Sequence, residues 1–219
     1  MEIYFKDCVF QFKIKKQNMN IISHQRNSIP QLLDTNPSYG VEVDIRSDGG
    51  KLIIHHDPFL KGESFEEWIN FYKHGTLVLN VKEEGLEEPL IRLLQLKGID
   101  NYFFLDQSFP FLIKWSRKGE RKCAIRVSEF ESIETALNLS GKVDWVWVDF
   151  FSRFSLTEKE AKCLKDARFK LCLVSPELQG HDASSEIPKL FFVLREKNIA
   201  PDAVCTKRPD LWEELILIP

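Results

Sequence analysis

Two carboxylates stand two residues apart in an otherwise apolar run, Val41-Glu42-Val43-Asp44-Ile45. Because side chains alternate along a β-strand, a strand here places Glu42 and Asp44 on one face. A charge in a buried strand is costly unless it is paired, metal-bound or catalytic. Two carboxylates on one face offer the hard oxygen ligands that Mg²⁺ and Ca²⁺ prefer. The spacing therefore predicts a divalent-metal site at Glu42 and Asp44.

The run from Leu77 to Lys82 repeats this alternation, with Asn80 and Lys82 on one face. A third metal ligand could be the side-chain oxygen of Asn80, Asp106, or neither. A metal that contacts a phosphate oxygen neutralises charge while the phosphorus is attacked. Lys82 is predicted to stabilise the same developing charge.

Histidines suit the proton transfers of such a reaction, because they titrate near neutral pH. His24 follows the apolar run Ile21-Ile22-Ser23, and a second candidate lies in Ile54-His55-His56-Asp57-Pro58. Strand register decides whether His55 or His56 faces the site.

Further polar groups follow the strand-like runs and are candidates for substrate contacts. Arg26 is placed to grip a phosphate oxygen. Asn27 comes directly after it, and Asp106 ends a later run. Arg126 and Asp149 lie near the ends of two more runs, where they could equally form a structural ion pair.

The elements that must position these groups alternate along the chain between strands and helices. Eight β-rich runs occupy Asn20–His24, Gly40–Arg46, Thr76–Lys82, Asn101–Asp106, Lys122–Ser128, Val143–Phe151, Phe169–Ser175 and Ala203–Thr206. Helical periods fill Leu86–Lys97, Ser132–Leu139, Thr157–Arg168 and Ser185–Lys197.

This alternation indicates βαβ units and a parallel sheet. We predict an α/β fold, a single-domain (β/α)8 TIM barrel over residues 1–219, in which the carboxyl ends of the strands form the active mouth. The alternative, an open doubly wound sheet, lacks a G-x-G-x-x-G after its first strand.

Three segments lie outside this repeat. Lys51–His56 is predicted to form a hairpin with Gly40–Arg46 through the Asp48-Gly49-Gly50 turn. Met1–Lys16 is a candidate cap for the closed end of the barrel. Glu63–Lys73 has a helical pattern.

Composition excludes several classes of protein. The net charge of −3 over 219 residues disfavours a nucleic-acid partner. No run approaches the 18 apolar residues of a membrane span, so stable membrane insertion is not expected. The five cysteines show no C-x-x-C spacing, and Cys172 and Cys205 fit buried apolar positions. We expect a cytoplasmic protein and make no prediction of its oligomeric state.

Taken together, the motifs resemble the glycerophosphodiester phosphodiesterase superfamily, in particular its short, single-domain bacterial branch often found with surface-polysaccharide genes. The resemblance is carried by His24-x-Arg26-Asn27, Glu42-x-Asp44, His56-Asp57-Pro58 and a strand ending Asn80-Val81-Lys82. In the second half of the chain it is carried by Leu105–Pro110, Arg126–Glu129 and Ser175–Leu178.

The resemblance implies a (β/α)8 barrel with a divalent metal, Mg²⁺ or Ca²⁺, held by Glu42 and Asp44. It implies His24 and His56 as the acid/base pair and Lys82 as a phosphate contact. The family's usual reaction splits a phosphodiester into an alcohol and a phosphomonoester, often after attack by a neighbouring substrate hydroxyl.

Three departures from the family pattern stand out. Gln25 and Arg26 follow His24 in place of the usual Arg-Gly, so the phosphate-gripping arginine is displaced by one position. Asn80 replaces the acid that is the family's third metal ligand, and Asp106 or Glu177 could compensate. The segment from Asp57 to Asn80 is too short for the insertion that often recognises glycerol.

The leading hypothesis is a metal-dependent phosphodiester hydrolase that acts on a small molecule, either a glycerophosphodiester or a surface-glycan phosphodiester. One alternative is a non-catalytic barrel that binds a phosphorylated sugar or lipid headgroup, which Asn80 favours. Another is a lyase that stops at a cyclic phosphate.

Overall fold

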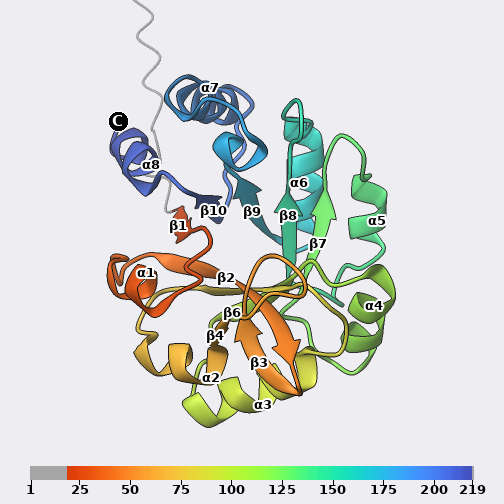
Figure 1. Cartoon of the computed structure of the whole chain (residues 1–219). Helices are drawn as coiled ribbons and strands as arrows, with labels where there is room; N and C mark the ends of the chain where they lie inside the picture. Colours follow the sequence, from red (N-terminus) through yellow and green to blue (C-terminus); the bar gives the residue numbers. More distant parts are fainter. Residues whose placement is uncertain (1–18, 219) are drawn as a thin grey trace, which may run out of the picture.

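The computed structural model describes residues 19–218, which form a mixed α/β fold (Figure 1). Parallel strands make one curled sheet in the spatial order β6-β5-β2-β1-β10-β9-β8-β7. They are β1 (Asn20–Ser23), β2 (Gly40–Asp48), β5 (Leu77–Val81), β6 (Tyr102–Leu105), β7 (Ala124–Val127), β8 (Trp145–Val148), β9 (Lys170–Val174) and β10 (Ala203–Thr206). All eight coincide with predicted runs. The predicted cap at Met1–Lys16 lies outside the described residues.

The two end strands of the sheet meet without forming a ladder. Among the described residues, β6 and β7 are joined by an isolated parallel bridge between Phe104 and Cys123. At this bridge the Phe104 N–H donates to the Lys122 carbonyl at 2.8 Å. Just beyond β6, Asp106 has a φ of 60°, so the extended backbone does not continue alongside β7. The sheet is therefore a curled one, and the continuous ladder of the predicted closed barrel is absent at this edge.

Apolar side chains fill the concave face of the sheet. Phe103 of β6 stacks on Trp145 of β8, with ring centroids 4.5 Å apart. Cys172 and Cys205 are buried in the same cluster, as predicted. The remaining members are Ile22, Val78, Leu105, Ala124, Trp147, Val174 and Ala203.

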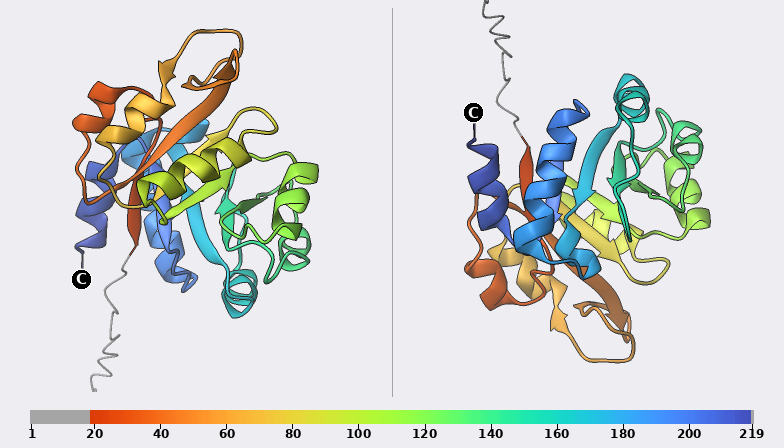
Figure 2. Two further views of the ribbon diagram at one scale, coloured as in Figure 1. Left: turned by 90° about the horizontal axis from the view of Figure 1, so that it is seen from below. Right: turned by 90° about the horizontal axis from the view of Figure 1, so that it is seen from above.

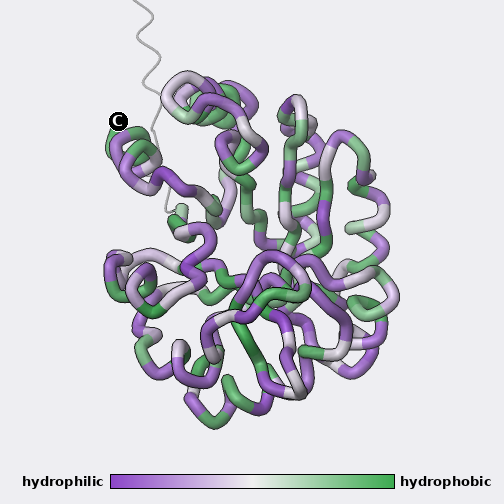
Figure 3. The backbone as a smooth tube through the Cα atoms, viewed as in Figure 1, coloured by the Kyte–Doolittle hydropathy of each residue, from purple (hydrophilic) through white to green (hydrophobic). Residues whose placement is uncertain are grey.

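Helices cover the convex face of the sheet (Figure 1). They are α1 (Ile29–Leu33), α2 (Phe65–Trp68), α3 (Glu87–Lys97), α4 (Phe109–Arg117), α5 (Ile133–Leu137), α6 (Glu158–Asp166), α7 (Ala183–Glu196) and α8 (Pro209–Ile216), with 3₁₀ turns η1 (Ile69–Phe71) and η2 (Pro176–Gln179). Figure 3 shows hydrophobic and hydrophilic residues alternating along them, as expected for helices with one buried face. In the described part of the chain, no helix is both long enough and apolar enough to cross a bilayer.

Four helices match predicted segments, whereas α1, α4 and α8 were not predicted. Each of these three carries a proline in its first turn: Pro30, Pro110 and Pro209. Proline is common there because the first-turn N–H groups have no partner within the helix. This signal could have revealed all three from the sequence.

The predicted hairpin extends β2 beyond the sheet. β3 (Lys51–Ile54) pairs antiparallel with the end of β2, across a turn in which Gly49 and Gly50 have φ values of 56° and 82°. β4 (Glu63–Ser64) then pairs with β3. Figure 2 shows the hairpin projecting past the helices. The predicted helical segment Glu63–Lys73 consists of β4, α2 and η1.

Candidate active site

Three neighbouring strands bring five of the predicted site residues together. β1 leads into His24, β2 carries Glu42 and Asp44, and β5 carries Asn80 and leads into Lys82. β2 lies between β1 and β5 in the sheet, and Asp44 is directly opposite Asn80 in the ladder. Because parallel strands end at the same edge, these side chains share one mouth.

Glu42 is completely buried and bonded on both carboxylate oxygens. Its Oε2 accepts the Gln25 N–H at 2.7 Å, and its Oε1 accepts Nδ2 of Asn80 at 2.9 Å. Gln25 reaches it from a left-handed backbone conformation, φ 51°. Burial, followed by the charge of Asp44, raises the pKa of Glu42 to about 8. A divalent cation bound beside this carboxyl would lower its pKa and favour the ionised form.

Asp44 is also buried, and it is fixed by its neighbours. Its Oδ2 accepts Nδ2 of Asn27 at 2.7 Å, while its own N–H donates to Asn27 Oδ1 at 3.0 Å. The Lys82 ammonium lies 3.2 Å from Asp44 Oδ1 and 3.7 Å from Asp106 Oδ2. Asn27, a predicted substrate contact, thus clamps the predicted metal ligand.

The oxygens that could hold a metal are those without a hydrogen bond. Asp44 Oδ1 and Asn80 Oδ1 are buried, and neither accepts a hydrogen bond. In residues 19–218 no group of three or more His, Cys, Asp or Glu side chains is arranged as a metal site. The donors without a hydrogen bond are therefore Asp44 Oδ1 and the Asn80 amide oxygen, and Glu42 would add a carboxylate oxygen only by releasing one of its hydrogen bonds. Oxygen donors of this kind suit a hard divalent cation.

His24 is held as a neutral imidazole. Its backbone N–H donates to the Thr206 carbonyl at 2.9 Å, which fixes it at the end of β1. Burial, followed by the charge of Lys207, lowers the pKa of His24 to about 4. Its Nε2 lies 3.8 Å from Glu42 Oε2, and its Nδ1 has no partner. A neutral histidine with an unpaired nitrogen can accept a proton.

The hairpin distinguishes His55 from His56. His55 Nδ1 accepts the Asp57 N–H at 3.0 Å, so this ring is part of the local turn. His56 is exposed, and its Nδ1 lies 2.8 Å from Asp57 Oδ1. That hydrogen bond lowers the pKa of the Asp57 carboxyl. In the described residues no hydrogen bond or ion pair joins the His56 ring to the five side chains gathered by β1, β2 and β5.

Arg46 connects the two parts of the site and was not singled out from the sequence. Its Nη2 donates to the His56 carbonyl at 2.9 Å, and its Nη1 donates to the Lys82 carbonyl at 3.3 Å. The available signal was spacing, because Arg46 continues the period-two series of Glu42 and Asp44 along β2. One guanidinium thus ties the hairpin to the end of β5.

An ion-pair chain continues from Lys82 around the mouth. Asp106, a predicted substrate contact and alternative metal ligand, pairs with both Lys82 and Arg126. Arg126 Nη1 lies 3.6 Å from Asp149 Oδ2, and Gln179 donates to Asp149 Oδ1 at 2.8 Å. Arg126 and Asp149 therefore form the structural pair that the sequence left open.

Two other predicted groups are engaged with the backbone or with hydroxyls. Arg26, the predicted phosphate contact, donates from Nε and Nη2 to the His24 carbonyl at 3.0 and 2.8 Å. Glu177, an alternative metal ligand, accepts hydrogen bonds on both oxygens, from Ser175 Oγ and Thr206 Oγ1. In this structure Arg26 supports His24, and Glu177 joins β9 to β10.

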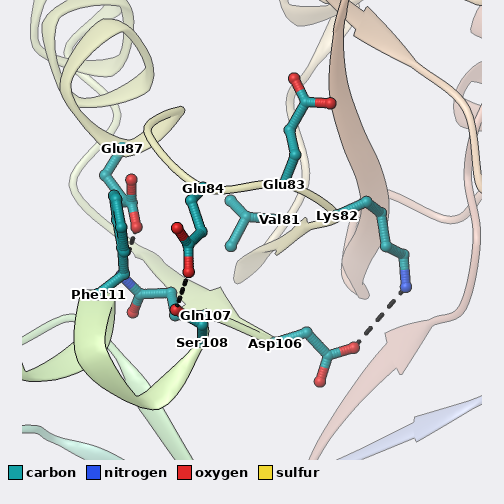
Figure 4. Close-up of a pocket in the computed structure, with 9 residues that line it drawn as sticks. All are labelled: Val81, Lys82, Glu83, Glu84, Glu87, Asp106, Gln107, Ser108 and Phe111. Atoms are coloured by element: carbon teal, nitrogen blue, oxygen red, sulfur yellow. Dashed lines mark hydrogen bonds and ion pairs between the residues drawn. The ribbon is translucent and has the colours of Figure 1, made fainter. Parts of the chain in front are cut away.

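A pocket of about 290 Å³ opens beside Lys82 and Asp106 (Figure 4). It lies between the ends of β5 and β6 and the first turns of α3 and α4. Its other lining residues are Val81, Glu83, Glu84, Glu87, Gln107, Ser108 and Phe111.

Comparison with known proteins identifies the fold. No protein-family model matches the sequence, and no curated protein matches it. Among solved structures, a glycerophosphodiester phosphodiesterase from Agrobacterium tumefaciens is similar with a TM-score of 0.64 and 12% identity, over 90% of this chain and 98% of that one. A protein assigned to the same activity from Galdieria sulphuraria is similar with a TM-score of 0.68 and 16% identity, over 90% and 97%. The chain thus shares the fold of glycerophosphodiester phosphodiesterase structures, the superfamily that its motifs resemble.

Proposed function

We propose that this chain is a divalent-metal-dependent phosphodiesterase that cleaves a glycerophosphodiester or a surface-glycan phosphodiester at the mouth of a (β/α)8 barrel. The observation that carries the proposal is the pair of unbonded, buried oxygens, Asp44 Oδ1 and Asn80 Oδ1, beside the Lys82 ammonium. Asp44 Oδ1 has only the Lys82 ammonium as a partner, 3.2 Å away, and Asn80 Oδ1 has no donor, so both oxygens retain capacity for a cationic ligand.

The metal, held by Glu42, Asp44 and Asn80, would supply Lewis-acid stabilisation of a phosphate oxygen. Lys82 stabilises the charge that develops on the phosphate. Neutral His24 takes the proton from the attacking oxygen, and His56, supported by the Asp57 carboxylate, gives a proton to the leaving alkoxide.

When a neighbouring substrate hydroxyl attacks, its oxygen bonds to phosphorus and the alcohol leaves, which gives a cyclic phosphate. Water then opens the ring to a phosphomonoester while the two histidines exchange roles. A lyase would stop before this second step. In ³¹P NMR spectra a lyase would accumulate the cyclic phosphate alone, whereas a hydrolase would go on to the phosphomonoester.

The test is turnover of glycerophosphodiesters and bis-(p-nitrophenyl) phosphate with Mg²⁺, Ca²⁺, Mn²⁺ or EDTA. We expect metal-dependent turnover that is lost in His24→Ala. His74→Ala is the matched control, because His74 contacts the Thr35 carbonyl and precedes β5 at the opposite end of the strand. Turnover that persists in His24→Ala would contradict the proposed role of His24.

The alternative is a non-catalytic barrel that binds a phosphorylated sugar or lipid headgroup. It is favoured by Asn80, whose neutral amide is a weaker metal ligand than a carboxylate. Binding of glycerol 3-phosphate without turnover of any diester under any metal would favour this alternative.

A further inference from the structure

The pocket beside the mouth is lined at one end mainly by carboxylates. Lys82 and Asp106 form the wall that it shares with the proposed active site (Figure 4). The rest of its polar lining includes three more carboxylates, on Glu83, Glu84 and Glu87. Lys82 is already shared between Asp44 and Asp106. The far end of the pocket is therefore acidic, and phosphate would be repelled there.

Two oxygens in this acidic end lack partners. Glu87, at the start of α3, is only 1% exposed, and its Oε2 accepts no hydrogen bond. Gln107 donates from Nε2 to Glu87 Oε1 at 2.9 Å, while its own Oε1 is buried without a partner. One buried carboxylate oxygen and one buried amide oxygen lack donors here, which favours a ligand with N–H groups and a positive charge.

The aromatic content of the pocket favours a primary ammonium over a quaternary ammonium as its ligand. A quaternary ammonium has no N–H group and is bound mainly over aromatic faces. The one aromatic residue that lines this pocket, Phe111, already carries the Lys114 ammonium 4.4 Å from its ring centroid. The unpaired oxygens of Glu87 and Gln107 instead match a primary ammonium, which has three donors.

We propose that this pocket binds a primary ammonium on the leaving alcohol, so that the favoured substrate is a zwitterionic phosphodiester of a short amino alcohol. The inference rests on the proposed function, which places the phosphate at Lys82, and Lys82 and Glu87 line the same pocket. The pocket volume, about 290 Å³, accommodates an aminoethyl group.

The test compares glycerophosphoethanolamine with the uncharged glycerophosphopropanol and the quaternary glycerophosphocholine. In wild type we expect kcat/KM for the primary amine to exceed the other two by about 10- to 100-fold, the range of a charged hydrogen bond. Glu87→Gln should reduce this ratio to within about threefold. Glu88→Gln is the matched control, because Glu88 is exposed on α3 and pairs with Arg92; it should keep the wild-type ratio.

Glu84→Gln provides a second variant, should Glu87→Gln fail to fold. Glu84 is exposed, accepts a hydrogen bond from Ser108 at 2.5 Å and lines the same pocket, so a smaller loss of the ratio is expected. Equal kcat/KM values for all three diesters would overturn the inference while the proposed function stands.

A binding measurement separates the inference from catalysis. Wild type and Glu87→Gln are titrated by calorimetry with 2-aminoethyl phosphate and with propyl phosphate. Without turnover of any diester, tighter binding of the amine that is lost in Glu87→Gln would support the pocket's role and overturn the proposed catalysis. Without turnover and without preference for the amine, both proposals fail.

Discussion

The two halves of the mouth, the β1–β6 half and the β7–β10 half, differ in how many of their buried polar side-chain atoms are hydrogen-bonded. Around β1, β2, β5 and β6, several buried atoms have no hydrogen-bond partner: His24 Nδ1, Asp44 Oδ1, Asn80 Oδ1, Glu87 Oε2 and Gln107 Oε1. Around β7 to β10, the described buried side-chain atoms at the mouth are all paired, for example those of Asp149 and Ser175.

This difference indicates that one half of the mouth binds ligands and that the other half stabilises the fold. Natural proteins pair nearly all buried polar groups, and exceptions concentrate where a ligand or reaction needs them. The β1–β6 half is therefore expected to bind metal and substrate, whereas the β7–β10 half holds the sheet together. Substitutions in the first half should affect turnover, and those in the second half should affect stability.

The largest effect is expected at the metal site. Asp44→Asn removes the charge on the unbonded oxygen and should lower kcat/KM by at least about 100-fold, measured at saturating Mg²⁺. Asp149→Asn makes the same chemical change in the paired half and should leave kcat/KM within a few-fold of wild type. Equal losses in both variants would contradict the separation.

Lys82→Ala should lower kcat/KM by about 100- to 1,000-fold, because the ammonium stabilises charge in the transition state. At saturating Mg²⁺ the thermal midpoint should change little, because the proposed metal would replace Lys82 as the cation beside the buried Asp44 carboxylate. Differential scanning calorimetry checks this second outcome. Unfolding of Lys82→Ala where wild type remains folded would indicate a structural role.

Asn80→Asp restores the acid of the resembled family. The added charge should tighten Mg²⁺ binding about 10-fold, as measured by calorimetry. Without metal, the same variant should be less stable than wild type, because a third carboxylate joins Glu42 and Asp44 and the amide donor to Glu42 is lost. Unchanged metal affinity would show that residue 80 does not contact the cation.

Arg126→Ala tests the paired half directly. It leaves Asp106 and the buried Asp149 without their shared cation, so the free energy of unfolding should fall by about 1–3 kcal/mol. Urea denaturation measures this change. The kcat/KM of the folded variant should remain within a few-fold of wild type; a 100-fold loss would extend the catalytic region to β7.

The smallest effect concerns pH. The pKa of Glu42 is about 8 in the metal-free fold, above its ordinary value of 4.5, so the folded state holds an extra proton between these values. The stability associated with that proton is full below pH 4.5 and declines as pH rises to 8. Because metal binding needs the ionised form, Mg²⁺ affinity should rise over the same interval. Glu42→Gln should flatten this dependence of metal-free stability.

Period-two alternation was sufficient to predict the strands and the face shared by Glu42 and Asp44, because burial on both sides of a parallel sheet leaves few places for a charge. Alternation could not predict side-chain contacts across loops. The left-handed backbone at Gln25, which brings its N–H to Glu42, carries no glycine signal.

The direction of individual side chains was also beyond the sequence pattern. Arg26 was predicted to contact phosphate, but its guanidinium turns back to the carbonyl of His24, two residues away. The acidic pocket depends on Glu87, at the start of α3, meeting Gln107, which lies twenty residues later in the loop after β6. Such pairings follow from the curl of the sheet, and local periodicity does not encode them.

The most direct test of the account is calorimetric titration of the metal-free chain with Mg²⁺, Ca²⁺ and Mn²⁺ at pH 8. We predict one divalent-metal site per chain, lost in Asp44→Asn and retained in Arg126→Ala. No binding of any of the three metals at millimolar concentration would contradict the account, and the binding-module alternative would replace it.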